Sequence, residues 1–530
     1  MRLQVVTAVA TLAATSACQT LWSRDVDYKA LSKELSSSAK VYFPGSEDFK
    51  VASTRWSNLD TPTVNIVVVP STENDVVETV SSTYLYFFDT PIIPSFDRWF
   101  LLPDMSDLSR ISPTRVKFAN KKKLPFLAYN GAHGAITTLG KMTQGIEIYL
   151  DQLSGVKIAQ DGKSATIAGG TKSKTVIETL WEAGKQTVTG CCECVSYLGP
   201  ALGGGHGWLQ GRHGLVADQF ESINIVLSNG TLATVGPESE LWWGLKGAGH
   251  NFGIVTSVTS KIYDVEYNNW AFEIMTFKGS KVEELYEATN KYILKNGTQP
   301  TDLINWSYWF NLPDVDPTGP VVQIILIQEG VDAIDSAYSA PFLKLDPISV
   351  DKQKGSYTDL AKWVGVSTTD GPCQKNGAMN PRFPIYLETF NAAAQKKAFD
   401  FFAENVRGGS AFNNSLVAFD GYSTQGVKSI ESKSTAFAYR DQNILVGPLI
   451  TYTPGSAELD KKAAEVGSKI RQILHEGTGR EHVPAYVNYA YGDEGPEQWY
   501  GSESWRQSRL QSLKKAYDPE GLFSFYAPIV

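Results

Sequence analysis

Residues 189–211, TGCCECVSYLGPALGGGHGWLQG, combine thiols and bare backbone within a short span of the chain. The stretch holds three of the five cysteines of the protein, Cys191, Cys192 and Cys194. Four glycines in five positions follow them, Gly203, Gly204, Gly205 and Gly207. This combination indicates a metal site, disulfide bonds, or a cofactor that is cradled by backbone and bonded covalently.

Spacing discriminates among these three interpretations. Structural zinc sites prefer paired C-x₂₋₄-C spacing, and the adjacent thiols of Cys191 and Cys192 do not readily reach one ion. Zinc held with His206 or His213 is therefore disfavoured, and we predict no metal. Disulfides are compatible with any other role of the stretch, and the remaining cysteines are Cys18 and Cys373.

The glycine run favours a cofactor site. Glycine lets backbone N–H groups approach an anionic or planar group closely. The run differs from the dinucleotide fingerprint G-x-G-x-x-G, because it does not open the first βα unit and lacks the acidic residue downstream. Glycine alone would be weak evidence, since glycine clusters are more often plain turns.

Length and composition predict a globular protein with more than one domain. A chain of 530 residues exceeds the usual size of one hydrophobic core. Its 42% hydrophobic and 20% charged residues are ordinary for a soluble protein. The net charge of −8 argues against a nucleic-acid partner, which needs a basic face. We expect a monomer that acts on a small molecule.

The N-terminus predicts a secretory signal peptide over residues 1–17, with a buried N-terminal helix as the alternative. Arg2 precedes an apolar run that is too short to span a bilayer, and small residues follow at 15–17. No later apolar run has the length of a membrane span, so no membrane partner is expected. Four glycosylation sequons begin at Asn229, Asn296, Asn305 and Asn413. Together these features predict a secreted glycoprotein.

Apolar patterning predicts a βαβ unit with an interruption. Val64–Val69 indicates a buried strand, Ser71–Val80 a helix, and Leu124–Tyr129 the next strand. The segment between them, residues 81–115, is rich in Phe and Pro and has no clean period. It is either a translated intron or late insertion, or a lid loop.

Later elements follow the same patterns. Predicted strands are Ser164–Ala168, Asn224–Leu227, Thr231–Val235 and Val321–Gln328. Predicted helices are Lys172–Gly184, Ala392–Glu404 and Ser502–Lys515. The dipeptide Asn229-Gly230 predicts a hairpin turn.

Several motifs lie in the order found in a known family. They are LPFLAYNGAHG at 124–134, CECVSYLGPALGGGHGWLQGRHGLVADQ at 192–219, LWWGLKGAGHNFGIV at 241–255, AFAYR at 436–440, YVNY at 486–489 and YDPEGLF at 517–523. The chain resembles the berberine-bridge-enzyme-like group of FAD-linked oxidases, within the vanillyl-alcohol-oxidase superfamily, and its fungal secreted members in particular. The resemblance runs from about Trp56 to the end, apart from residues 81–115.

The resemblance implies an α+β fold. A two-lobed PCMH-type FAD-binding domain would span residues 56–266. A substrate domain, with an antiparallel sheet covered by helices, would span residues 267–480. Residues 481–530 would form a C-terminal segment that returns to the FAD domain.

The resemblance also implies FAD with two covalent bonds, one to a histidine nitrogen and one to a cysteine sulfur. His133 and Cys192 fall on those positions. The remaining positions aligned with the cofactor are Asn130, Gly131, Ala132, Gly134, Val195, Gly204, Gly205, Gly207, Ile254, Val255 and Asn488. The sequence departs from the commonest family pattern in having Asn130-Gly-Ala-His133 where Arg-Ser-Gly-Gly-His is frequent.

The catalytic base expected from the resemblance is Tyr489, the second tyrosine of Tyr-x-Asn-Tyr. A phenol needs a nearby acceptor or cation to take a proton at neutral pH, and Asp420 is the candidate partner. The alternatives are a packing tyrosine and a turn aspartate before Gly421. Relatives with a Glu or Gln base would place it near 447–449, where this chain has Gly-Pro-Leu.

The expected reaction is hydride transfer from an alcohol or sugar-type donor to the flavin, and then to O₂ with release of H₂O₂. Val195, three residues after the predicted tether, resembles the gatekeeper of the oxidases in this group. Two alternatives are a tailoring oxidoreductase that acts on a hydrophobic alcohol, and a non-enzymatic carbohydrate-binding protein. The latter would use Asn305–Phe310 as an aromatic platform.

Overall fold

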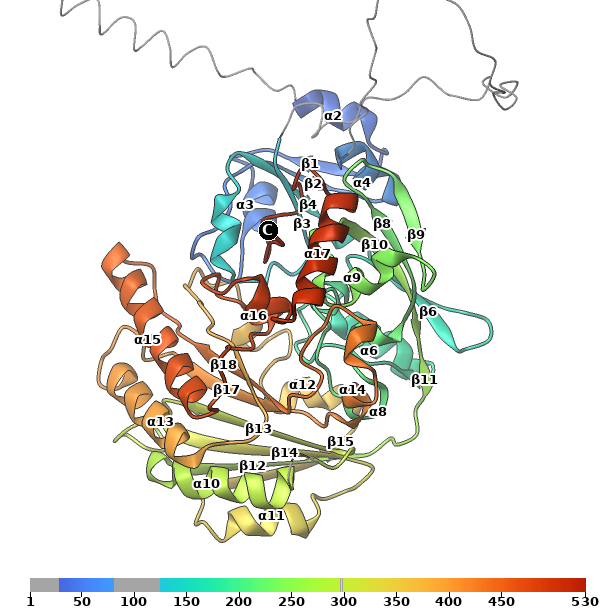
Figure 1. Cartoon of the computed structure of the whole chain (residues 1–530). Helices are drawn as coiled ribbons and strands as arrows, with labels where there is room; N and C mark the ends of the chain where they lie inside the picture. The colour runs from blue at the N-terminus through green and yellow to red at the C-terminus, as the bar shows by residue number, and fades with distance from the viewer. Residues whose placement is uncertain (1–27, 81–123, 296, 298) are drawn as a thin grey trace, which may run out of the picture.

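The structure is a computed structural model that describes residues 28–80, 124–295, 297 and 299–530. The predicted signal peptide and the segment 81–115 lie outside these residues. Figure 1 shows two parts: one carries the smaller sheets, and the other is built on a single large sheet. Within the described residues, no helix combines the length and the apolar character needed to cross a bilayer.

The first part contains a four-stranded sheet in the order β1-β2-β4-β3. Its strands are β1 (Lys40–Tyr42), β2 (Val64–Val69), β4 (Gly145–Tyr149) and β3 (Phe126–Tyr129). Strand β2 pairs in parallel with β4, as β3 does, while β1 pairs antiparallel with β2. The apolar run of β2 is buried against helix α4 (Glu73–Val80), as its sequence predicts.

A second sheet packs beside it in the order β5-β6-β10-β8-β9, with all pairs antiparallel. Its strands are β5 (Val156–Ile158), β6 (Ser164–Ala168), β10 (Ile254–Lys261), β8 (Phe220–Val226) and β9 (Leu232–Val235). The predicted turn between β8 and β9 is present: Gly230 adopts a φ of +78°, a conformation that glycine accepts without strain. A short pair, β7 (Lys185–Gln186) with β11 (Tyr263–Asp264), completes this part.

The helices of the first part surround these sheets. They are α2 (Tyr28–Glu34), α3 (Glu47–Ser53), α4, α6 (Ser173–Glu182), α7 (Leu198–Ala201), α8 (Gln210–His213) and α9 (Glu240–Ala248). Helices α16 (Pro496–Tyr500) and α17 (Ser504–Tyr517), near the end of the chain, also lie against this part in Figure 1.

The second part is a seven-stranded antiparallel sheet in the order β15-β12-β14-β13-β17-β18-β16. Its strands are β15 (Ser349–Gly355), β12 (Trp270–Lys278), β14 (Val321–Glu329), β13 (Leu303–Phe310), β17 (Leu416–Gly421), β18 (Ile444–Leu449) and β16 (Ile385–Leu387). The helices that accompany it are α10 (Val282–Ala288), α11 (Ser336–Leu343), α12 (Leu360–Trp363), α13 (Ala392–Val406), α14 (Gln425–Lys428) and α15 (Ala457–Glu476).

This sheet is buried on both faces, which explains the unbroken apolar run of β14. Ile324 and Leu326 pack into the core under the outer helices, whereas Ile325 and Ile327 pack toward the first part. Figure 1 shows α10, α11, α13 and α15 on the outer face. The α+β fold class expected from the sequence is therefore confirmed.

Two sequence-based expectations for β13 are wrong. The aromatic platform proposed for Asn305–Phe310 is not presented to solvent, because Trp306 and Trp309 are buried in the two cores. The sequon asparagine Asn305 is only 6% exposed, so it is not accessible for glycosylation. The sequon asparagines Asn229 and Asn413 are exposed, and Asn296 lies outside the described residues.

A buried ion pair joins the two parts. Arg440 donates through both terminal nitrogens to the carboxylate of Asp218, at 2.9 and 2.8 Å, and each side chain is 3% exposed. Asp218 also accepts the backbone N–H of Leu215 at 2.9 Å, at the end of the glycine-rich stretch. The pair therefore fixes the glycine loop of the first part to the chain that precedes β18.

Removing one partner should be costly, because the other charge stays buried. We expect Arg440→Met to lower the free energy of unfolding by about 3–5 kcal/mol. Lys397→Met is the matched control: it breaks an exposed pair with Glu476 and should cost less than about 1 kcal/mol. Denaturant titration of both variants measures the difference. If both variants lost the same small amount of unfolding free energy, the buried pair would not hold the two parts together.

Candidate active site

His133 lies in a tight loop that leaves β3. The loop turns at Ala132, which has a φ of +52°, and the Ala132 carbonyl accepts the N–H of Trp56 at 3.1 Å. The Trp56 ring stacks on the His133 ring with centroids 4.2 Å apart. At the edge of the His133 ring, Nε2 lies 2.8 Å from the carbonyl oxygen of Pro372.

This carbonyl fixes the tautomer of His133. A carbonyl oxygen only accepts, so Nε2 carries the proton and Nδ1 keeps its lone pair. Burial, assisted by the charge of Arg382, lowers the pKa of His133 to about 3. The ring is therefore neutral at physiological pH, with a nucleophilic nitrogen at Nδ1.

The first turn of helix α6 holds the thiol loop. The N–H of Ser173 donates to the carbonyl of Val195 at 2.9 Å, and that of Lys174 donates to the carbonyl of Glu193 at 3.2 Å. Gly131 lies directly against this loop: a Cβ there would stand 3.1 Å from the carbonyl oxygen of Cys194. Such close approach of backbone to backbone brings the two loops together.

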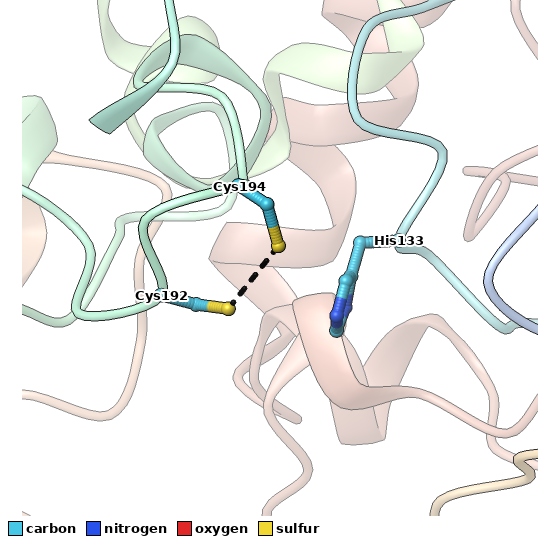
Figure 2. A group of neighbouring side chains, drawn as sticks. All are labelled: His133, Cys192 and Cys194. Atoms are coloured by element: carbon cyan, nitrogen blue, oxygen red, sulfur yellow. Dashed lines mark hydrogen bonds between the residues drawn. The ribbon is translucent and has the colours of Figure 1, made fainter. Parts of the chain in front are cut away.

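As a result, His133, Cys192 and Cys194 converge, and their donor atoms lie within 4.8 Å of one another (Figure 2). Cys194 is bonded to Cys373 in a disulfide, so it has no thiolate to offer a metal. Cys191 lies elsewhere, with its sulfur 3.1 Å from the hydroxyl of Tyr422. Cys192 is the thiol that stands free beside His133. Burial raises its pKa to about 11, and the charge of Arg382 opposes this rise.

The two histidines considered as zinc ligands have other partners. His206 contacts Tyr386 Oη through Nε2 at 2.7 Å and Gln210 Oε1 through Nδ1 at 2.8 Å. His213 stacks on Tyr263 with centroids 3.7 Å apart. The structure thus does not bring these rings to the cysteines.

The glycine run packs where side chains have no room. Gly204 and Gly205 have φ values of +99° and +81°. A Cβ on Gly207 would stand 2.0 Å from the carbonyl oxygen of Thr189. Asn488 lies against Gly203 and donates to the carbonyl of Pro200 at 2.8 Å, which holds the loop from the other side.

A cavity of about 140 Å³ lies between these loops and β10. Among its lining residues are three predicted cofactor residues, Asn130, Ile254 and Val255. Both polar atoms of the Asn130 amide, and Nδ1 of His250, are buried without a hydrogen-bond partner in the described part of the chain. Gly134 lies against Tyr526, one of the lining residues: a Cβ at Gly134 would stand 2.9 Å from that ring. Unpartnered polar atoms in a glycine-bordered cavity fit one section of a bound dinucleotide cofactor.

Tyr489 and Asp420 form the second half of the site. Asp420 lies near the end of β17, and Tyr489 lies in the short 3₁₀ turn Val487–Tyr489. The phenol donates to Asp420 Oδ2 at 3.2 Å. Against the ring lies Gly447 of β18, where a Cβ would stand 3.2 Å from Tyr489 Cδ2. Glycine at this position leaves the space that the tyrosine ring fills.

Arg382 is a component of the site that the sequence analysis missed. Its guanidinium lies 4.5 Å from the ring centroids of both Trp56 and Tyr489. It therefore lies between the ring that stacks on His133 and the Tyr489–Asp420 pair. Among the described residues, no hydrogen bond or ion pair joins the guanidinium to an acceptor. No motif surrounds it, so nothing in the sequence distinguishes it from a surface arginine.

Side chains that the sequence analysis did not assign to the dyad lie around it. Burial raises the pKa of Asp420 to about 7, with the Tyr489 hydrogen bond and the Arg382 charge opposing the shift. Burial raises the pKa of Tyr489 well above its ordinary value, and Asp420 adds to this. Neighbours whose own pKa values are raised in part by Asp420 are Tyr308, Tyr422 and Cys191.

Comparison with known proteins gives matches over the whole chain. Residues 113–236 match the FAD binding domain family, and residues 485–530 match the family described as berberine and berberine like. The chain is 72% identical over 530 residues to the FAD-linked oxidoreductase chry5 of Gibberella zeae, with all of both chains covered. It is 66% identical over 535 residues to the FAD-linked oxidoreductase chyH of Penicillium rubens, again with both chains covered in full.

A solved structure shows the same fold at low identity. It is the glucooligosaccharide oxidase of Acremonium strictum, a protein described as carrying a 6-S-cysteinyl, 8α-N1-histidyl FAD. The TM-score is 0.74 at 15% identity, covering 95% of this chain and 99% of the other.

The buried carboxyl of Asp420 generates a stability prediction. Its pKa is raised from 3.8 to about 7 on folding, so the folded state holds an extra proton between those values and loses stability as pH rises through them. We expect Asp420→Asn to raise the melting temperature at pH 8, by relieving a cost on the order of 4 kcal/mol, and to change it little at pH 4.

Thermal unfolding at both pH values measures this effect. Asp314→Asn is the control, because Asp314 is exposed in a turn. A gain that is equal at pH 4 and pH 8 would contradict a buried, perturbed carboxyl at position 420.

Proposed function

The chain belongs to the berberine-bridge-like family of FAD-linked oxidoreductases, and from this we propose that it oxidises the hydroxyl-bearing carbon of a hydrophobic alcohol and passes the electrons to O₂. The observation that carries the proposal is the hydrogen bond of 3.2 Å between Tyr489 and Asp420. It places a proton acceptor behind a phenol, beside the loops that would hold the cofactor.

His133 and Cys192 would hold the flavin through two covalent bonds. When bound, FAD supplies the hydride-accepting ring. The neutral His133 with its lone pair on Nδ1 is the form able to make such a bond. The FAD described for the Acremonium strictum oxidase is attached through N1 of a histidine, which is the same ring atom, and through a cysteine sulfur.

Tyr489 would receive the proton of the substrate hydroxyl. Its own proton passes to Asp420 Oδ2, whose carboxylate form predominates above pH 7. The Arg382 guanidinium, 4.5 Å from the Tyr489 ring, stabilises the negative charge that the pair holds. Removal of the hydroxyl proton raises the electron density on the adjacent carbon, which would favour loss of a hydride from that carbon.

The surroundings of the dyad favour a hydrophobic donor. Aromatic rings dominate them: Tyr308 and Tyr422 lie beside Asp420, and Tyr489 contributes its own ring. Flat apolar rings suit a planar or aromatic alcohol. A sugar donor is the second candidate, because the fold is shared with an oligosaccharide oxidase.

The acceptor is inferred from one residue, and the compartment from a disulfide and two exposed sequons. Val195, a small side chain three residues after Cys192, supports access of O₂ to the cofactor. The disulfide between Cys194 and Cys373, with exposed sequons at Asn229 and Asn413, supports an oxidising, secretory compartment.

Covalent attachment can be tested by acid precipitation. We expect the yellow colour to stay in the pellet for the protein and for each of His133→Ala and Cys192→Ala, because one bond suffices to retain the flavin. The double variant should release the colour to the supernatant. Colour released from the unaltered protein would mean that neither His133 nor Cys192 is bonded to the flavin. A colourless protein would show that it binds no flavin.

The dyad can be tested by H₂O₂ production as a function of pH. We expect kcat/KM on an aromatic alcohol to rise with pH to a plateau, with a midpoint near the pKa of Asp420, about 7. In Tyr489→Phe, kcat/KM at the plateau should fall about 10²–10⁴-fold. In Asp420→Asn, the rise of kcat/KM around pH 7 should disappear.

Tyr338→Phe is the matched control, since Tyr338 lies on α11, on the outer face of the large sheet. An unchanged profile in Asp420→Asn would exclude that carboxyl as the proton acceptor. Turnover of oligosaccharides but of no aromatic alcohol would show that the donor is a sugar. It would not contradict the role proposed for Tyr489 and Asp420.

A further inference from the structure

We propose that Cys192, Cys194 and Cys373 form an exchangeable set of sulfurs, in which the position of the disulfide decides whether Cys192 is free to bond the flavin. The consequence for the flavin rests on the function proposed above. The exchange itself rests only on the arrangement of the three sulfurs.

The free thiol touches both ends of the disulfide. Cys194 and Cys373 are bonded, and the Cys192 sulfur lies 3.6 Å from the Cys194 sulfur and 3.5 Å from the Cys373 sulfur. It stands beside the bond, almost equally far from each end. Exchange needs the attacking sulfur in line with the S–S bond, so the Cys192 side chain must first turn to another staggered position, beyond one end of the disulfide.

The surrounding loops are held together without the disulfide. The N–H of Glu193 donates to the carbonyl of Val366 at 3.1 Å. The Glu193 carboxylate accepts the N–H of Thr368 at 2.9 Å through one oxygen, and pairs with Lys174 at 3.3 Å through the other. Glu193 lies between Cys192 and Cys194 in the sequence, so it keeps the loop of Cys373 beside both of them whichever pair is bonded.

The exchange balances without an oxidant. The Cys192 thiolate attacks the Cys373 sulfur, the Cys194–Cys373 bond breaks, and Cys194 leaves as a thiolate. Attack on the Cys194 sulfur forms the Cys192–Cys194 disulfide and releases Cys373 in the same way. One disulfide and one thiol exist before and after each step. Because burial raises the pKa of Cys192 to about 11, the attacking form is scarce at neutral pH and the exchange is slow.

Only one of the three pairings suits a flavin bond to Cys192. The Cys194–Cys373 disulfide leaves Cys192 free, whereas either alternative consumes it. The same loop also orients the second predicted tether, because the carbonyl of Pro372, next to Cys373, accepts from His133 Nε2 at 2.8 Å. A thioether at Cys192 would remove that sulfur from exchange and so keep the productive pairing.

Peptide mapping of full-length variants tests this proposal. Each protein is alkylated with N-ethylmaleimide at acid pH to stop exchange, digested without reductant, and analysed by mass. We expect Cys194→Ser to contain a Cys192–Cys373 disulfide and Cys373→Ser to contain a Cys192–Cys194 disulfide. In both variants the amount of the flavin–Cys192 peptide should fall about tenfold, because the Cys192 sulfur is then part of a disulfide. Cys191→Ser is the control and should keep the Cys194–Cys373 pairing, since its sulfur faces Tyr422.

Two alkylated thiols in both Cys194→Ser and Cys373→Ser would overturn the proposal. The readout separates this result from a failure of the proposed function. If the oxidising secretory pathway forms the two alternative disulfides as expected but no protein contains a flavin–Cys192 peptide, the alternative pairings stand and the assignment of Cys192 as a tether fails.

Discussion

Backbone packed directly on backbone sets the geometry of the site. Gly131 lies against the carbonyl of Cys194, and Gly207 lies against the carbonyl of Thr189, at distances that leave no free room for a side chain. The first contact brings the loop after β3 onto the loop before α7, although the strands they leave belong to different sheets, and the second holds the loop before α7 against the glycine run. The convergence of His133 and Cys192 depends on that approach, and so does the disulfide beside them.

Two arginines have opposite roles because their surroundings differ. Arg440 is paired with Asp218 through both terminal nitrogens and contributes to the fold, since each charge offsets the burial of the other. Arg382 has aromatic rings on both sides and no anion bound to it in the described residues, so its charge acts on its neighbours. It lowers the pKa of His133 while it opposes the burial-driven rise at Cys192 and Asp420. One unpaired cation thus influences both halves of the site.

The sequence predicts local elements and motif positions better than contacts between distant segments. Strands β2 and β6 follow from apolar runs in local sequence, and the turn at Gly230 follows from its dipeptide. The meeting of Tyr489 with Asp420 was expected only through resemblance, because 69 residues separate them.

Arg382 and the pairing of Cys194 with Cys373 could not be predicted, since each depends on where a loop of the large-sheet part folds back onto the first part. The interpretation of the aromatic run of β13 as an exposed platform is wrong for a related reason. Alternating aromatic residues occur on an exposed platform and on a strand buried on both faces, and only the packing of helices and the first part distinguishes the two cases.

The C-terminal segment has a consequence for the order in which the protein is made. Phe523, Phe525 and Tyr526 line the cavity that also contains Asn130, and Tyr489 belongs to the same returning segment. Figure 1 shows the end of the chain lying within the first part, beside strands that are synthesised far earlier. The cavity therefore closes only after residues 522–526 have been synthesised. A chain that stopped before Leu522 would lack this part of the cavity wall, however well its earlier strands folded.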